Sequence, residues 1–194
     1  MFEYLPNIIF VVVLFLGLYF FSRNLHRLYR NINLGKQIDV SDNKKQRFIN
    51  MSKIALGQGK LIKRPISGFL HVVVYVGFII INIELLEIIL DGILGSHRLF
   101  SDYMGSFYGY LIGTFEFLAV SVLLAVSVFW IRRNVIKLKR FFGDNMKGWP
   151  KSDANIILYF EVVLMVLFIT MNATDLKFQQ MNSGNLISGY IYGF

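Results

Sequence analysis

The chain changes from cationic to apolar at residues 64–71, Arg64-Pro65-Ile66-Ser67-Gly68-Phe69-Leu70-His71. A proline at the second of these positions favours the first turn of a helix, where its missing N–H costs nothing. About 25 mostly apolar residues follow, enough to cross a bilayer core of about 30 Å at ~1.5 Å per residue. The stretch therefore predicts a membrane-spanning helix over 66–90, with one histidine, His71, near its cationic end.

Apolar blocks of this kind occur four times, so the sequence predicts an all-α integral membrane protein with four transmembrane helices. Of the 194 residues, 55% are hydrophobic, whereas soluble domains usually contain about 45–50% apolar residues. The first block is interpreted as a span and not as a cleaved signal peptide, because no positive charge precedes it and no small-residue cleavage site follows it. Residues 1–174 form the predicted transmembrane domain and 175–194 a tail outside the cytoplasm, with spans at 5–21, 66–90, 108–131 and 156–174.

Lysine and arginine are concentrated in two loops, 22–65 and 132–155, which hold 11 and 7 of the 20 cationic residues. Cytoplasmic loops of membrane proteins carry such an excess, so both loops are predicted to be cytoplasmic and both termini to lie outside. This topology accounts for most of the net charge of +8, with membrane lipid as the expected partner. Nucleic-acid binding is not expected.

Two further features of the polar segments bear on structure and function. The helix of the first span is expected to continue past the membrane through Arg30, and residues 48–62 are expected to form a short amphipathic helix at the membrane interface. The chain contains no cysteine. Iron–sulfur clusters are held by cysteine thiolates, so the chain holds no such cluster of its own.

His71 is the first candidate functional residue, because an intramembrane histidine is by default a functional hypothesis. Gly68 and Gly77 lie to either side of its helix stripe, where a flat cofactor or a neighbouring helix can approach closely. His71 can ligate a haem iron, act as a proton relay, or be hydrogen-bonded near the cytoplasmic interface. A bis-histidine haem site needs a second histidine at similar depth, and His26 and His97 both lie outside the apolar blocks. The stripe contains Ser67, His71, Val74, Phe78 and Asn82.

The acidic residues of the spans are the second group of candidates: Glu84 and Glu87 in the second span and Glu116 in the third. A carboxyl group in apolar surroundings can hold a proton, so these residues are candidates for proton exchange with a quinol. The alternative is that they pair with Arg98, His97 or backbone donors and fix helix packing. A proton- or ion-coupled transporter would use the same three carboxyl groups.

Cationic side chains at the cytoplasmic ends of the spans form a third group. Arg64 is a candidate contact for a haem propionate, and Lys63, Arg132 and Arg133 occupy similar positions. Such residues can also bind an acidic soluble partner or anchor the helices to lipid headgroups.

Two segments resemble a known family of membrane cytochrome b domains. Residues 61–78 resemble the second helix of a domain similar to the gamma subunit of respiratory nitrate reductase and the membrane subunit of heterodisulfide reductase. Residues 82–98 resemble a branch in which the membrane domain precedes a cytoplasmic iron–sulfur oxidoreductase domain on one polypeptide. The segments read Leu61-Ile62-Lys63-Arg64-Pro65-Ile66-Ser67-Gly68-Phe69-Leu70-His71-Val72-Val73-Val74-Tyr75-Val76-Gly77-Phe78 and Asn82-Ile83-Glu84-Leu85-Leu86-Glu87-Ile88-Ile89-Leu90-Asp91-Gly92-Ile93-Leu94-Gly95-Ser96-His97-Arg98.

The resemblance implies a b-type haem, with His71 as an axial ligand to its iron. In the family, the second helix supplies axial histidines and a fifth helix supplies their partners. Only His71 matches, since the second family position is Ile81 here. The second ligand is therefore expected from outside this chain, which is either the front part of a longer polypeptide or a separate partner subunit.

The implied function is electron transfer between the quinone pool, as substrate, and a cytoplasmic iron–sulfur protein or domain. The chain would then be part of a quinone-linked iron–sulfur oxidoreductase, within a larger complex of the bacterial inner membrane. The alternative is a non-redox membrane anchor or accessory subunit of such a complex.

Overall fold

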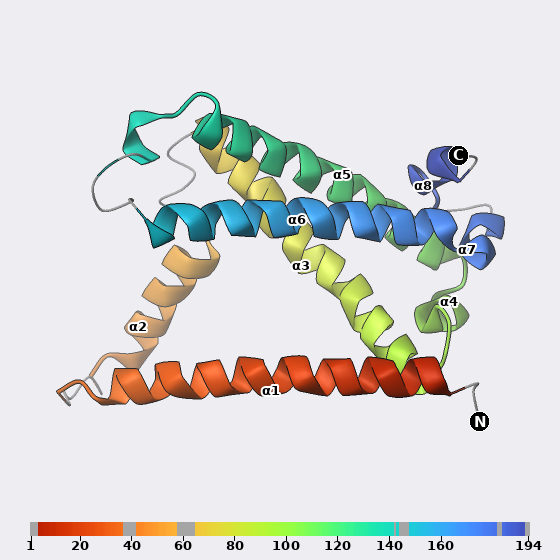
Figure 1. The fold of residues 1–194 in the computed structure, drawn as a ribbon, viewed down its shortest axis with the longest axis horizontal. Helices are drawn as coiled ribbons and strands as arrows, with labels where there is room; N and C mark the ends of the chain where they lie inside the picture. Colours follow the sequence, from red (N-terminus) through yellow and green to blue (C-terminus); the bar gives the residue numbers. More distant parts are fainter. Residues whose placement is uncertain are drawn as a thin grey trace. The chain divides into compact units, whose positions relative to one another are not determined.

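The computed structural model is helical and contains no strand in the residues that it describes (Figure 1). These are residues 4–36, 42–57, 65–141, 143, 148–181 and 184–192. Four of the helices are long and apolar enough to cross a membrane, which confirms the predicted fold class. They are α1 (Leu5–Asn33), α3 (Pro65–Leu94), α5 (Ser106–Asn134) and α6 (Trp149–Thr174).

All three prolines of the chain lie in the first turn of a long helix, Pro6 in α1, Pro65 in α3 and Pro150 in α6. In the first turn, the missing N–H of proline would have no helical acceptor, and its fixed φ suits the helix. Proline explains why α6 begins at Trp149, although its apolar block begins only at Ile156. The polar first turns of α6 thus extend the helix beyond the predicted span.

Shorter helices lie between the first three long helices. The helix α2 (Lys44–Met51) continues as the π-helical turn η1 (Ser52–Leu56), and α4 (Leu99–Met104) follows α3. The amphipathic helix predicted over 48–62 therefore begins earlier than expected, and residues 58–64 lie outside the described residues. The predicted continuation of the first helix through Arg30 is confirmed, since α1 runs to Asn33.

The chain divides into two compact units, residues 1–60 with 87–99 and residues 61–86 with 100–194. In the first unit, the amide of Asn7 in α1 donates a hydrogen bond to the carbonyl of Gly92 in α3 at 2.9 Å. A Cβ atom at Gly92 would overlap the ring of Phe10, so glycine permits this contact. No residue of α1 is buried, so its apolar side chains remain available to lipid or to a partner.

Asp91 organises the turn between α3 and α4, within the first unit. Its carboxylate accepts hydrogen bonds from the Ser96 hydroxyl at 2.6 Å and from the backbone N–H groups of Arg98 at 2.7 Å and Leu99 at 3.1 Å. Backbone donors at a chain reversal need such acceptors when they are shielded from water. The turn therefore has a defined structure.

The core of the second unit is built on α5, which packs along α6 (Figure 1). The buried side chains of α5 follow a spacing of alternating four and three residues, the heptad pattern by which helices pack side by side. They meet Met165, Phe168 and Ile169 of α6 and Phe178 of the tail. The α5 side chains are Tyr108, Ile112, Phe115, Ala119, Val122 and Val126.

Gly77 lets α3 approach α5 closely in the second unit. The glycine is buried, and a Cβ atom at this position would overlap Cγ2 of Val122. Small residues at such contacts allow transmembrane helices to come close enough for backbone and side-chain packing. The α3–α5 contact therefore depends on the absence of a side chain at residue 77.

Gly77→Ala is expected to destabilise the protein by about 1–3 kcal/mol, because overpacking of a tight contact costs this much. The control is Gly17→Ala on α1, where no atom lies within 4 Å of the added Cβ. That variant should be neutral or stabilised by up to about 1 kcal/mol, because alanine favours helix more than glycine does. The free energy of unfolding of both variants and of the wild type can be measured in detergent micelles. Equal stability of Gly77→Ala and the wild type would contradict the close contact between Gly77 and Val122.

Candidate functional site

His71 is the seventh residue of α3 and belongs to the second unit. Its side chain is exposed, and its ring meets the ring of Phe129 on α5 edge-to-face, with centroids 6.5 Å apart. Such aromatic contacts favour one orientation of the ring. The imidazole is therefore supported by a neighbouring helix and accessible to a group outside the chain.

The other residues predicted around His71 differ in their surroundings. Gly68 and Gly77 are both buried. The space beside Gly77 is taken by Val122 of α5, so a neighbouring helix approaches closely here, which was one of the two interpretations of this glycine. Arg64, the predicted propionate contact, lies outside the described residues.

The second unit contains a single histidine that could serve as a metal or haem ligand. His71 is the one histidine in its sequence, since His26 and His97 belong to the first unit. Within the described ranges, no group of three or more histidine, cysteine or acidic side chains is arranged to hold a metal ion. An exposed imidazole fits half of a bis-histidine haem site, and the other half must come from another chain or segment.

The three predicted carboxyl groups are all buried. Glu84 and Glu87 are each 2% exposed and lie three residues apart on α3, and Glu116 of α5 is 0% exposed. Glu84 and Glu116 belong to the second unit, and Glu87 belongs to the first. Buried acidic residues are seldom found without a partner or a function.

Glu116 holds the C-terminal segment against α5 and α6. One carboxylate oxygen accepts a hydrogen bond from the amide of Asn172 in α6 at 3.1 Å. The other accepts from the backbone N–H groups of Ile187 at 2.8 Å and Ser188 at 3.2 Å. Ser188 begins the short helix α8 (Ser188–Ile191). These bonds support the packing role that was one of the two interpretations for this residue, and its proton role stays a prediction.

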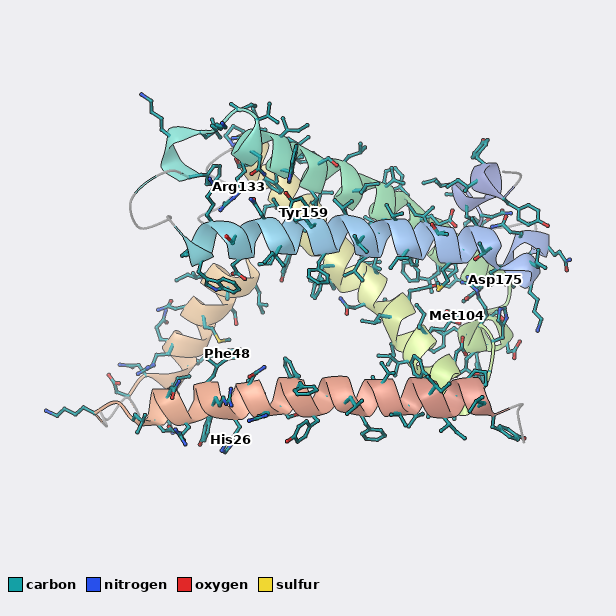
Figure 2. The ribbon with its side chains drawn as sticks, viewed as in Figure 1. His26, Phe48, Met104, Arg133, Tyr159 and Asp175 are labelled. Atoms are coloured by element: carbon teal, nitrogen blue, oxygen red, sulfur yellow. The ribbon has the colours of Figure 1, made fainter. Side chains whose placement is uncertain are left out.

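A chain of polar groups extends from Glu116 into the tail. The amide of Gln179 in α7 (Leu176–Gln180) donates to the carbonyl of Asn172 at 2.8 Å and to the Ser188 hydroxyl at 3.0 Å. Asn185 in turn donates to the side-chain oxygen of Gln179 at 3.3 Å. At the start of α7, Asp175 accepts from the N–H of Phe178 at 3.1 Å (Figure 2). Fully paired networks of this kind order the segments that they join.

Sequence reasoning missed this docked tail, although two signals were present. Gly109 and Gly113 repeat at a spacing of four on α5, and the tail packs onto both of them: a Cβ at Gly184 would lie 2.8 Å from the Gly109 carbonyl oxygen. Small residues at this spacing mark close approach in membranes. The second signal is Asn172, an amide side chain within the fourth apolar block.

The fold and these groups define a multi-helix membrane protein with an exposed histidine on one of its long apolar helices and a set of buried carboxyl groups. The chain is 25% identical over 169 residues to the probable iron-sulfur-binding oxidoreductase FadF of Bacillus subtilis (strain 168). The match covers 87% of this chain but 23% of that protein, so the chain spans about a quarter of the relative's length. No family model matches the chain. No solved structure matches it.

Glu116→Ala is expected to release the tail, because it leaves buried N–H groups without an acceptor, at a cost of about 1–3 kcal/mol. Lys177 is the one trypsin site in residues 175–194, so release should accelerate cleavage there. Mass spectrometry of the 178–194 peptide measures the rate. In the control Glu161→Ala, which removes a half-buried carboxyl group of α6, cleavage should stay slow. Equal cleavage rates in the wild type and in Glu116→Ala would contradict the claim that Glu116 holds the tail in place.

Proposed function

We propose that the chain is the membrane electron-transfer domain or subunit of an iron–sulfur oxidoreductase and exchanges electrons with the quinone pool. The observation that carries the proposal is the relation to an iron-sulfur-binding oxidoreductase along 87% of this chain. The chain contains no cysteine and therefore no thiolate ligand for a cluster. Any iron–sulfur centre would belong to a partner protein or to a further domain.

The proposed role of His71 is to ligate the iron of a b-type haem. Its exposure on α3 supports this role, because a ligand from outside the chain can complete the iron site from the open side. The edge contact with Phe129 would fix the plane of the ring. A haem bound in this way supplies one-electron transfer, which links a quinone to one-electron centres.

The proposed partner surface lies on the basic side of the membrane. Arg132 lies in the last turn of α5, and three arginines follow the apolar part of α1 at residues 23, 27 and 30. If these loops are cytoplasmic, as the distribution of charge predicts, the iron–sulfur partner meets the domain there. Glu84 and Glu87 are the proposed proton-exchanging groups for a quinol, because both are buried on a membrane-spanning helix.

A second candidate function is a non-redox membrane anchor within the same kind of complex. One observation favours it: the chain offers a single histidine within its apolar spans. An anchor would use the open apolar surface of α1 to bind a partner and would need no haem. The two candidates therefore differ in whether His71 is required.

The first test is a reduced-minus-oxidised visible spectrum of the native complex, purified through a tag on this chain. We expect a b-type band that is lost in His71→Ala, because no other intramembrane histidine can replace it. His26→Ala and His97→Ala are matched controls and should keep the band. A wild-type complex without haem, or a band that survives in His71→Ala, would refute the redox role of this residue.

The predicted orientation can be tested because the chain contains no cysteine. Single cysteines at Ser52 and Gly143 should react with a membrane-impermeant maleimide only in inverted vesicles. Cysteines at Tyr103 and Tyr190, both more than 80% exposed, should react in intact spheroplasts. The reverse pattern would place the basic loops outside and exclude a cytoplasmic iron–sulfur partner at those loops.

A further inference from the structure

The basic end of the α5–α6 pair contains a polar cluster that the proposed function does not use. The amides of Asn134 in α5 and Asn155 in α6 bond each other at 3.2 and 3.4 Å. Arg133 lies one residue earlier on α5 (Figure 2). Its side chain is buried, with only 7% of the residue exposed. A guanidinium group is rarely buried to this extent unless it is paired.

The neighbours of Arg133 satisfy only part of its side chain. Nη2 donates to the carbonyl oxygen of Lys151 at 3.1 Å, and the ring of Phe141, in the turn η2 (Lys139–Phe141), lies 5.4 Å from the guanidinium carbon. Neither neighbour carries a negative charge at the contact. Among the described residues, no acidic group forms an ion pair with Arg133.

Two buried N–H donors at this place have no acceptor. Within the described part of the chain, neither Nε of Arg133 nor Nε1 of Trp130 has a hydrogen-bond partner. The two residues are three apart on α5, so they lie on one side of the helix. An unpaired buried donor is costly, more so when it carries charge. The arrangement therefore calls for an acceptor with negative charge.

We propose that Arg133 and Trp130 bind a phosphate oxyanion, supplied by the headgroup of a membrane phospholipid. Both groups donate and neither accepts, which suits a ligand with oxygen acceptors only. The site lies where an apolar span ends in tryptophan and arginines, the depth at which headgroup phosphates are found. Because protein encloses both nitrogen atoms, the turn around Phe141 would move aside as the phosphate enters. This proposal is independent of electron transfer.

The test uses Trp130 as its own reporter. The chain has two tryptophans, and Trp149 is 71% exposed, so Trp149→Phe leaves Trp130 as the one tryptophan at little cost in stability. The full chain is delipidated in an uncharged detergent and titrated with phosphatidylglycerol. We expect a saturable change in Trp130 emission, matched by retention of one lipid in native mass spectrometry. Diacylglycerol, which lacks phosphate, should produce neither.

Arg133→Gln should weaken the apparent affinity for phosphatidylglycerol about tenfold or more, as expected for a lost charge-assisted hydrogen bond. Arg132→Gln removes the same charge one residue away and should leave the affinity unchanged. If Arg133→Gln does not fold, Trp130→Phe keeps the ring and removes the donor, and mass spectrometry should still show weaker retention.

Four outcomes would overturn the proposal. Equal losses of lipid affinity in Arg132→Gln and Arg133→Gln would mean that the basic end of the helix pair attracts anionic lipid by its overall charge. A response to diacylglycerol would mean apolar insertion without phosphate recognition. No response to any lipid would mean that water satisfies the two donors. A titration with inorganic phosphate separates the two sources of the oxyanion: saturation by lipid alone supports the headgroup, and saturation by free phosphate at similar concentrations overturns it.

Discussion

The second unit depends on one buried carboxylate, Glu116, more than on any other polar group. Its two oxygens accept three hydrogen bonds, one from α6 and two from the start of α8. In a membrane, no water is available to replace these partners. Loss of the carboxylate would leave backbone donors unsatisfied and the tail without its attachment. The same bonds explain why a residue with the features of a proton carrier has a structural role here.

Two polar contacts hold α5 and α6 together, and the second half of the apolar heptad, Ala119, Val122 and Val126, lies between them. Glu116 and Asn172 form one contact, and the Asn134–Asn155 pair forms the other. About 27 Å of helix separates Glu116 from Asn134, at ~1.5 Å per residue. Packing between transmembrane helices gains little from the hydrophobic effect, so such contacts set register. Against this rigid pair, α3 packs through Gly77 and presents His71 on an open face.

The sequence predicted the four spans and the all-α class because long apolar blocks leave the backbone few alternatives in a bilayer. It predicted the apolar span at 156–174 but not the polar helical turns before it, because hydropathy does not detect a helix that begins at Trp149 in polar residues. It predicted residues 175–194 only as a tail outside the cytoplasm and not its docking, because the bonds that dock these residues join positions up to 72 apart. Hydropathy also could not show that Gly77 meets Val122. The roles of His71, Glu84 and Glu87 remain predictions, since chemistry at these residues depends on groups outside the chain.

The central claim is that this domain passes electrons between quinol and an iron–sulfur partner. The most direct measurement is made under anaerobic conditions. A reduced naphthoquinone analogue is added to the native complex, and the visible absorbance of the complex is followed. The claim predicts rapid reduction of a b-type centre by the quinol in the wild-type complex, and no such change in His71→Ala. A wild-type complex whose spectrum responds to dithionite but not to the quinol would contradict it.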